Sequence, residues 1–284
     1  MILVTGGTGH TGRRAVTALV DRGERVRVLT REPVKLALKL RRRVDICRGS
    51  LDDPAVAREA FDCASAVIAM THIGMAPRVV AAAREAGVRR AIFISSTRRF
   101  TKFPEETARR VIEGEQAVRD SGLDWTIIRP SMIYGSGHDN NFCHLQSALQ
   151  RWPVHPLIGG GRMLWQPVFT WDVVQAVLAA LDSSATIGKE YTVAGPEPIS
   201  YERMVRTFLR LMNRRVLLVP VPMSWAKAAV RLYGKVSKHP RVRLDQIQRL
   251  EEDKVFDITD ARRDLGFAPV SFEEGIRRKL AYEV

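Results

Sequence analysis

Short apolar runs alternate with segments of helical apolar spacing along the first 130 residues of the chain. The run at 2–5 precedes a predicted helix at 11–20, and the alternation continues as far as an apolar run at 125–130. Strands that alternate with helices in this way are typical of a parallel sheet with helices on both faces. The same pattern predicts strands at 25–30, 44–49, 66–71 and 90–96, and helices at 35–43, from 53 onward, at 77–86 and at 104–121.

After residue 130 the pattern loosens, and clusters of glycine, histidine, asparagine and proline separate the predicted elements. We predict a first domain over 1–130, completed by about 163–195, and a smaller C-terminal subdomain made of 131–162 and 196–284. The elements expected in this second half are strands at 166–170 and 191–194, a helix from 172 onward, and helices at 142–151, 200–212 and 224–235.

Three glycines follow the first predicted strand at intervals of three residues. Between a strand and a helix, this spacing is typical of a loop that binds the pyrophosphate of a dinucleotide. The first glycine permits a tight turn, the second lets backbone N–H groups reach the phosphates, and the third lets the helix pack close to the strand. The N-terminus of the helix adds free N–H groups and a positive dipole end. The predicted cofactor-binding residues of this loop are Gly6, Gly7, Thr8, Gly9, His10, Thr11 and Gly12.

The residue after the second predicted strand selects between NAD and NADP in folds of this kind. An acidic residue there binds the ribose 2′-hydroxyl, and an arginine accommodates a 2′-phosphate. This chain has Arg31 followed by Glu32. We therefore predict NADP as the preferred cofactor, and NAD remains possible if Arg31 is solvated and Glu32 binds the ribose.

The net charge of +14 favours anionic partners, such as cofactor phosphates, an anionic small-molecule substrate or acidic lipid. A generally basic surface without a partner is an equally good interpretation. The arginines are spread along the chain without a nucleic-acid motif, so nucleic acid is not expected. The basic stretch 231–249 is the best candidate for peripheral docking on an acidic surface, and a solvated helical face is the alternative.

Three widely spaced cysteines, Cys47, Cys63 and Cys143, predict a reducing compartment without disulfides or a metal site. The first predicted strand begins at residue 2, which leaves no room for a signal peptide, and no apolar run approaches the length of a membrane span. We expect a cytoplasmic monomer or homodimer.

Several motifs in a constant order carry a family resemblance: TGGTGHTG (5–12), ISST (94–97), SGLDWTIIRPSMIYG (121–135), QPVFTWDVVQAV (166–177), YTVAGPEP (191–198) and DITDARRDLGFAP (257–269). Together they resemble the short-chain dehydrogenase/reductase superfamily in its extended and atypical branches. The chain is similar to the NAD-dependent epimerase/dehydratase group, to NmrA-like proteins and to the NAD(P)-binding subunit of respiratory complex I. The resemblance implies a Rossmann-type doubly wound parallel sheet with a smaller C-terminal substrate-capping subdomain.

The resemblance also implies roles for single residues. Arg31 matches the 2′-phosphate position, and Leu51 matches a contact to adenine. Ser96 matches the catalytic Ser/Thr position at the end of the fifth strand, and Ser95 is predicted as a cofactor contact. Pro130 and Ser131 match the segment beside the nicotinamide.

The chain departs from the family at its catalytic pair, a tyrosine followed four residues later by a lysine. The corresponding positions hold Thr107 and Val111, and the first tyrosine of the chain is Tyr134. Without this pair, the usual proton transfer at the substrate oxygen has no donor. The remaining candidates for a chemical role are Ser96, Tyr134, His72 and His138, each of which also has a good structural interpretation.

Two functional interpretations follow. In the first, the protein is an NADPH-dependent oxidoreductase or a nucleotide-sugar epimerase/dehydratase-like enzyme that acts on a small molecule, such as a quinone or conjugated acceptor that needs less acid catalysis. In the second, it binds NADP(H) without turnover, as a redox sensor or structural subunit. We favour the enzyme, because the cap is full-sized, Ser96 is present and the cofactor motif is complete.

Overall fold

The computed structural model describes residues 1–103, 105–135, 140–236 and 251–282. The chain forms two compact units, each assembled from three segments of the sequence. Unit 1 comprises Met1–Ile133, Thr170–Ala194 and Asp257–Pro269. Unit 2 comprises Tyr134–Phe169, Gly195–Phe256 and Val270–Val284.

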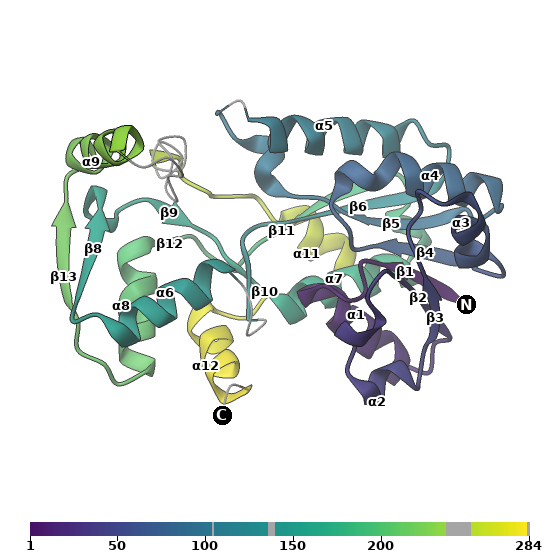
Figure 1. The fold of residues 1–284 in the computed structure, drawn as a ribbon, viewed down its shortest axis with the longest axis horizontal. Helices are drawn as coiled ribbons and strands as arrows, with labels where there is room; N and C mark the ends of the chain where they lie inside the picture. Colours follow the sequence, from purple (N-terminus) through teal and green to yellow (C-terminus); the bar gives the residue numbers. More distant parts are fainter. Residues whose placement is uncertain (104, 136–139, 237–250, 283–284) are drawn as a thin grey trace. The chain divides into compact units, whose positions relative to one another are not determined.

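A seven-stranded parallel sheet forms the centre of unit 1, in the order β11-β6-β5-β4-β1-β2-β3 (Figure 1). The chain runs outward from β1 to β3 and then returns to the other side of β1 at β4. Ligands of such sheets bind at this switch point, beyond the carboxyl ends of the strands. The predicted doubly wound sheet is thus confirmed. Its strands are β1 (Ile2–Thr5), β2 (Val26–Thr30), β3 (Asp45–Arg48), β4 (Ala66–Ala69), β5 (Arg90–Ile94), β6 (Asp124–Pro130) and β11 (Lys189–Val193).

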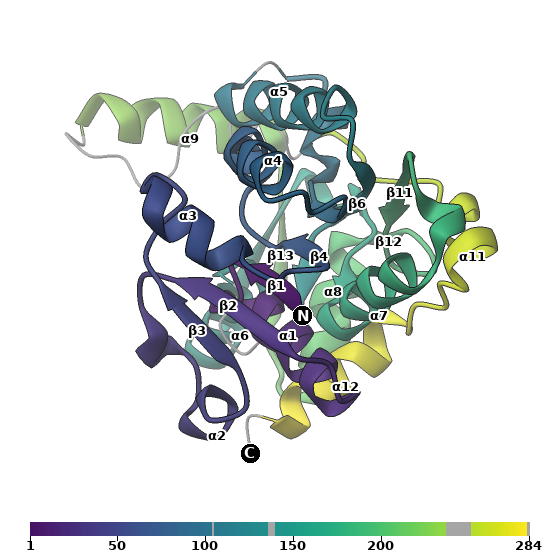
Figure 2. The same ribbon diagram turned by 90° about the vertical axis from the view of Figure 1, so that its right-hand side faces the viewer.

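Helices cover both faces of this sheet (Figure 2). One face carries α1 (His10–Asp21) and α7 (Thr170–Asp182), which pack against each other. The other face carries α3 (Pro54–Phe61), α4 (Ala76–Glu85) and α5 (Glu106–Arg119). The shorter elements are α2 (Leu38–Arg41), α11 (Thr259–Leu265) and the 3-10 helices η1 (Pro33–Lys35), η2 (Ile73–Met75), η3 (Thr97–Phe100) and η5 (Ser184–Thr186).

Burial on both faces explains the apolar character of the central strands. Every residue of β1 and β4 is buried, and their side chains pack against the helices of both layers. The helix α5 approaches the sheet closely at Gly114, where a Cβ would lie 2.3 Å from the carbonyl oxygen of Ile73 in η2. Glycine at this position therefore lets α5 lie against the segment that follows β4.

Unit 2 combines small strand pairs with helices. The strands β8 (Val154–Ile158) and β13 (Leu217–Val221) form a parallel pair, and β9 (Leu164–Trp165) pairs antiparallel with β12 (Ile199–Ser200). Five aromatic rings pack together in its core. The remaining elements are α6 (Asn140–Arg151), α8 (Tyr201–Leu211), α9 (Met223–Val236), α12 (Phe272–Tyr282), η4 (Gly159–Gly161) and the short pair β7 (Ile133–Tyr134) and β10 (Val168–Phe169).

Two segments differ from the sequence predictions. The basic helix expected over 35–43 is shortened to α2, because Leu36 and Ala37 have extended backbone and the Leu36 side chain is 1% exposed. The segment 257–269, expected in the C-terminal subdomain, belongs to unit 1. There Asp264 of α11 accepts hydrogen bonds from Lys189 at 2.9 Å and from Tyr191 at 3.0 Å, which fixes α11 beside β11.

Candidate cofactor and active site

The glycine loop connects β1 to α1, and its geometry excludes side chains at two positions. Gly6 has a φ of +71°, and a Cβ there would lie 2.8 Å from the backbone of Met70. A Cβ on Gly12 would lie 2.2 Å from the carbonyl oxygen of Gly6. Glycine is therefore required at both positions for the turn and for the close approach of α1 to β1.

The N-terminus of α1 faces the space above this loop. Gly9 is the N-cap residue, no side chain makes a capping hydrogen bond there, and no acidic residue lies in the first turn. First-turn N–H groups lack partners within a helix and attract anions. The loop and helix could therefore hold the pyrophosphate of a dinucleotide through backbone N–H groups. The Gly9 N–H is not one of these, because it already donates to the Gly6 carbonyl oxygen at 3.0 Å.

Two exposed arginines lie beside the loop at the carboxyl edge of the sheet. Arg31 directly follows β2, and Arg48 ends β3, where the strand register places it opposite Thr30. Neither guanidinium group makes a hydrogen bond or ion pair within the part of the chain that the structure describes. Both guanidinium groups are therefore available for an anion at the adenosine end of a cofactor. The sequence prediction missed Arg48, although an arginine at the end of the third strand was the available signal.

Glu32, the alternative ribose ligand, lies next to Arg31. It accepts a hydrogen bond from Lys35 at 2.8 Å, and both side chains are more than half exposed. This hydrogen bond and the positive charge of Lys35 lower the pKa of Glu32. Exposed ion pairs of this kind are weak, so the pairing does not prevent Glu32 from binding a ribose hydroxyl.

Three candidate residues lie at the carboxyl ends of adjacent strands. His72 follows β4, Ser96 follows β5 and Ser131 follows β6. The Ser96 hydroxyl is half-buried and accepts a hydrogen bond from the Arg98 backbone N–H at 3.2 Å, which starts η3. Pro130 ends β6, and the backbone N–H of Ser131 donates to Val193 at 2.9 Å. This edge is where the nicotinamide side of a dinucleotide would lie in such a sheet.

His72 caps η2, because its Nδ1 accepts a hydrogen bond from the Gly74 N–H at 3.0 Å. Partial burial and the positive charges of Arg110 and Arg98 lower the pKa of His72 from its usual value near 6.5. The imidazole is therefore neutral at pH 7, which suits a hydrogen-bonding role better than a role as a general acid. Leu51, the expected adenine contact, is partly buried and packs against the core of unit 1.

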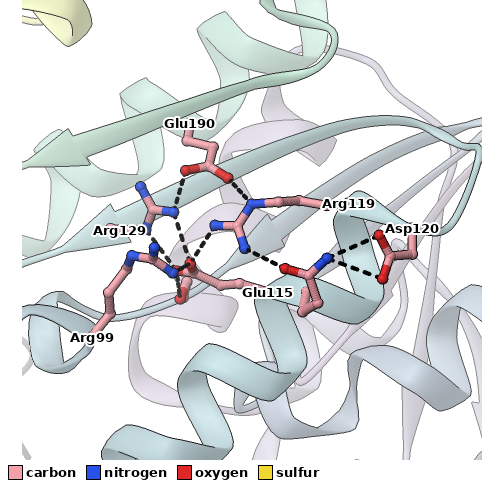
Figure 3. Close-up of polar contacts among 8 residues, drawn as sticks. Arg99, Glu115, Arg119, Asp120, Arg129 and Glu190 are labelled. Atoms are coloured by element: carbon pink, nitrogen blue, oxygen red, sulfur yellow. Dashed lines mark hydrogen bonds and ion pairs between the residues drawn. The ribbon is translucent and has the colours of Figure 1, made fainter.

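A buried ion network joins α5, β6 and β11 of unit 1 (Figure 3). Glu115 of α5 is fully buried and accepts hydrogen bonds from Arg129 Nε at 2.6 Å and Nη2 at 2.7 Å. It also accepts from the Ser95 hydroxyl at 2.5 Å, so the Ser95 side chain points into this network. The remaining members are Arg99, Arg119 and Glu190, which pair with Glu115 or Arg129.

These contacts keep the charged members ionised inside the unit. Burial alone would raise the pKa of Glu115, but hydrogen bonds from Arg129 and Ser95 outweigh it and hold the pKa below its usual value. Burial would likewise lower the pKa of Arg129, and hydrogen bonds to Glu115 and Glu190 raise it instead. The sequence prediction missed this network. Glu115 shares the buried face of α5 with Val111 and Val118, and a charge at such a position was the only signal.

Tyr134, a candidate for chemistry, lies in the core of unit 2 rather than on an accessible surface of that unit. Its side chain is 0% exposed, its ring packs between those of Phe142, Phe169 and Phe272, and its hydroxyl donates to the Phe272 carbonyl at 3.5 Å. Gly275 permits this, because a Cβ there would lie 2.0 Å from the hydroxyl oxygen. The surroundings give Tyr134 a packing role, and we assign it no chemical one. His138 and residues 237–250 of the docking candidate 231–249 lie outside the described residues.

The positions that correspond to the family's tyrosine and lysine both lie on α5. Thr107 is half-buried, and Val111 is fully buried in the hydrophobic core. No group of three metal-binding side chains occurs among the described residues. Within the same residues, no helix has the length and apolar character needed to cross a membrane.

Residues 6–149 match the model of a family described as NAD(P)H-binding. The chain is 32% identical over 234 residues to a (4-alkanoyl-5-oxo-2,5-dihydrofuran-3-yl)methyl phosphate reductase of Streptomyces griseus, covering 81% of this chain and 80% of the relative. It is 24% identical over 235 residues to an NAD(P)H azoreductase of Xenophilus azovorans, with coverage of 81% and 80%.

The fold is shared with solved structures at lower identity. A UDP-glucuronic acid 4-epimerase from Bacillus cereus in complex with NAD superposes with a TM-score of 0.78 at 16% identity, covering 99% of this chain and 97% of that one. Identity at this level shows a common fold only.

Proposed function

The chain belongs to the NAD(P)H-binding family, and from this premise we propose that it is an NADPH-dependent reductase of a small, electron-poor molecule. The family and the fold confirm the predicted relationship to short-chain dehydrogenases/reductases and NAD-dependent epimerases. Relatives named as reductases support an oxidoreductase- or epimerase-like enzyme. The preference for NADPH and the class of acceptor go beyond these findings.

The observation that carries the cofactor preference is the pair of exposed arginines, Arg31 and Arg48. A 2′-phosphate bound between the ends of β2 and β3 would receive hydrogen bonds from both guanidinium groups, which suit phosphate geometry. NAD lacks this phosphate, so it would gain nothing from either residue. The pair therefore favours NADP over NAD, as Arg31 alone did in the sequence.

The acceptor class follows from what the nicotinamide edge contains. Bound NADPH supplies a hydride, and the product needs one proton as well. The chain has no tyrosine before Tyr134, and Val111 is buried in the core, so the usual proton donor and its lysine are missing. An electron-poor double bond accepts hydride with less acid assistance than an isolated ketone. The Ser96 hydroxyl and the neutral His72 imidazole are the groups at this edge that we propose to orient such an acceptor.

The relatives' names agree with this choice. One name describes a phosphate ester whose dihydrofuran ring carries an alkanoyl and an oxo group, and the other describes reduction of azo compounds. Both substrates carry electron-withdrawing groups or an electron-poor double bond. An anionic substrate of this kind would also suit the net charge of +14.

The cofactor preference is tested by the substitution Arg31→Ala and by the matched control Arg25→Ala. Arg25 is an exposed arginine at the opposite end of β2. One charge-assisted hydrogen bond contributes about 1.5–3 kcal/mol, so Arg31→Ala should raise the Kd for NADPH about 10- to 100-fold. The Kd for NADH should remain unchanged, and Arg25→Ala should affect neither. Equal losses for both cofactors would refute the 2′-phosphate assignment.

The reaction is tested with NADPH deuterated at the transferable position. Purified protein is incubated with a panel of quinones, azo dyes and acyl-substituted dihydrofuranones, with and without a phosphate ester, and separately with a metabolite extract. Products are examined by mass spectrometry. Deuterium in an acceptor would establish the reductase and identify its substrate class. Absence of label throughout a metabolite extract, with tight NADPH binding in the same tube, would favour the non-catalytic sensor or structural subunit.

A further inference from the structure

The ribbon of β8 and β13 in unit 2 presents a face made only of apolar side chains. The register places Leu217 opposite Val154 and Val219 opposite Pro156, and alternate residues of a strand share one face. Leu217 is 64% exposed, Val154 47% and Val219 37%, and Pro156 is also exposed. Figure 1 shows the two strands side by side. Large exposed apolar patches mark interaction sites.

An exposed aromatic residue lies just before the start of the ribbon. Trp152 lies two residues before Val154 and is 58% exposed. The Arg151 guanidinium lies 5.6 Å from the centroid of its ring. We call Trp152, Val154, Pro156, Leu217 and Val219 the ribbon face.

Arginines border the ribbon face on one side. A shallow hollow of about 750 Å³ is lined by Leu217 of the ribbon face and by Arg203, Arg206, Arg210, Arg214 and Arg215. Three of these arginines pair with Glu197, Glu202 and Glu273. Arg215 has no hydrogen bond or ion pair among the described residues. The border therefore carries net positive charge next to an apolar surface.

We propose that the ribbon face docks on a membrane surface that contains anionic phospholipid. Arginine stems can lie along apolar surface while the guanidinium groups reach lipid phosphates. Tryptophan is enriched at the level of lipid headgroups, which suits Trp152 at the start of the ribbon. The apolar face would enter the boundary between headgroups and acyl chains.

Charge complementarity selects this partner over a second copy of the chain. In a two-fold symmetric dimer the same patch meets itself, so a second copy brings the same net positive border and offers this face no charge complementarity. An anionic membrane instead attracts the arginines. The proposal does not rest on the reductase assignment, because it uses neither the cofactor loop nor the carboxyl edge of the large sheet.

The test is co-sedimentation of the full chain with vesicles of phosphatidylcholine alone and of phosphatidylcholine mixed with phosphatidylglycerol. We expect binding only to the mixed vesicles. Binding should fall when salt rises from about 0.1 M to about 1 M, because the Debye length shortens from about 10 Å to about 3 Å. Brominated phosphatidylcholine in the mixed vesicles should quench tryptophan fluorescence, and Trp152→Phe should remove most of that quenching.

Three variants separate the contributions. Leu217→Glu should weaken binding by about tenfold or more, because it removes a leucine from the buried face. Arg215→Gln should weaken binding about fivefold, the value of one basic residue near an anionic surface. Leu38→Glu is the matched control, since Leu38 of unit 1 is 56% exposed beside basic residues. It should bind as the unchanged protein does.

Several results would overturn the proposal. Failure of the unchanged protein to sediment with mixed vesicles would do so, as would equal binding to uncharged vesicles or equal effects of Leu217→Glu and Leu38→Glu. Dimerisation that Leu217→Glu abolishes, without vesicle binding, would show that the face pairs with a second copy instead. A circular dichroism spectrum and a Tm equal to those of the unchanged protein would show that Leu217→Glu is folded. Loss of reductase activity without loss of vesicle binding would bear on the reductase proposal alone.

Discussion

The substitution Glu115→Gln should destabilise unit 1 by removing one charge from its buried ion network. The network contains three arginines and two glutamates, and Glu115 is its fully buried member. Glutamine keeps the shape of the side chain but leaves Arg129, which is 5% exposed, with Glu190 as its one remaining anionic partner among the described residues. Removing one partner of a buried pair costs about 3–5 kcal/mol. Because Glu190 partly compensates, we expect about 3 kcal/mol.

The assay is thermal unfolding followed by circular dichroism at neutral pH. For a unit of this size, each kcal/mol changes the Tm by about 2–4 °C, so Glu115→Gln should lower the Tm by about 6–12 °C. Glu113→Gln on the same helix is the control, because Glu113 is 66% exposed and its pairing with Arg109 is weak. A decrease of less than about 2 °C for Glu115→Gln, or one no larger than that of the control, would refute the reasoning.

Two further measurements sharpen the result. Replacing the pair by apolar residues, Glu115→Leu with Arg129→Met, should cost less than Glu115→Gln alone, because no buried charge is left unpaired. The pKa of Glu115 lies below 4.5 in the folded chain. Its stabilisation is therefore complete above the unfolded pKa and is lost as the pH falls through the folded value. As the pH is lowered through this range, the Tm of Glu115→Gln should therefore fall less than the Tm of the unchanged protein.

Three other predictions concern unit 1. Gly12→Ala should abolish binding of both NADPH and NADH by fluorescence titration, because the added Cβ would lie 2.2 Å from the Gly6 carbonyl oxygen; retained affinity would contradict the loop assignment. Burial raises the pKa of Cys47 to about 11, so iodoacetamide at pH 8 should modify the exposed Cys63 and leave Cys47 unmodified by mass spectrometry, and equal labelling would refute the burial argument. His72 should titrate below pH 6.5 by NMR because burial and nearby arginines disfavour its charged form, and an ordinary or raised pKa would contradict its described surroundings.

The sequence predicted the parts of the fold that local pattern determines. The glycine spacing at 6–12 and the apolar runs of β1 and β4 lie within short windows, so periodicity and turn chemistry were sufficient. The position of Arg31 could be predicted in the same way, because it depends only on where β2 ends.

The remaining features depend on contacts between distant segments. Arg129 pairs with both Glu115 and Glu190, and the three residues come from three separate elements. The sequence around each of them gives no sign of the other two. The pairing of β8 with β13 brings together residues about 60 positions apart. The helix predicted over 35–43 was too long, because burial of Leu36 outweighed the helical propensity of its neighbours.

The three-segment assembly of unit 1 has a consequence for synthesis of the chain on the ribosome. The strand β11 pairs with β6 and follows it by about 60 residues. At about 5–20 residues per second, the edge of β6 emerges several seconds before its partner exists. During that interval the nascent sheet exposes an unpaired strand edge, which is a template for aggregation. Arg129 also lacks its partner Glu190 during that interval, because Glu190 lies in β11. The last charged residue of the network is therefore synthesised together with the last strand of the sheet.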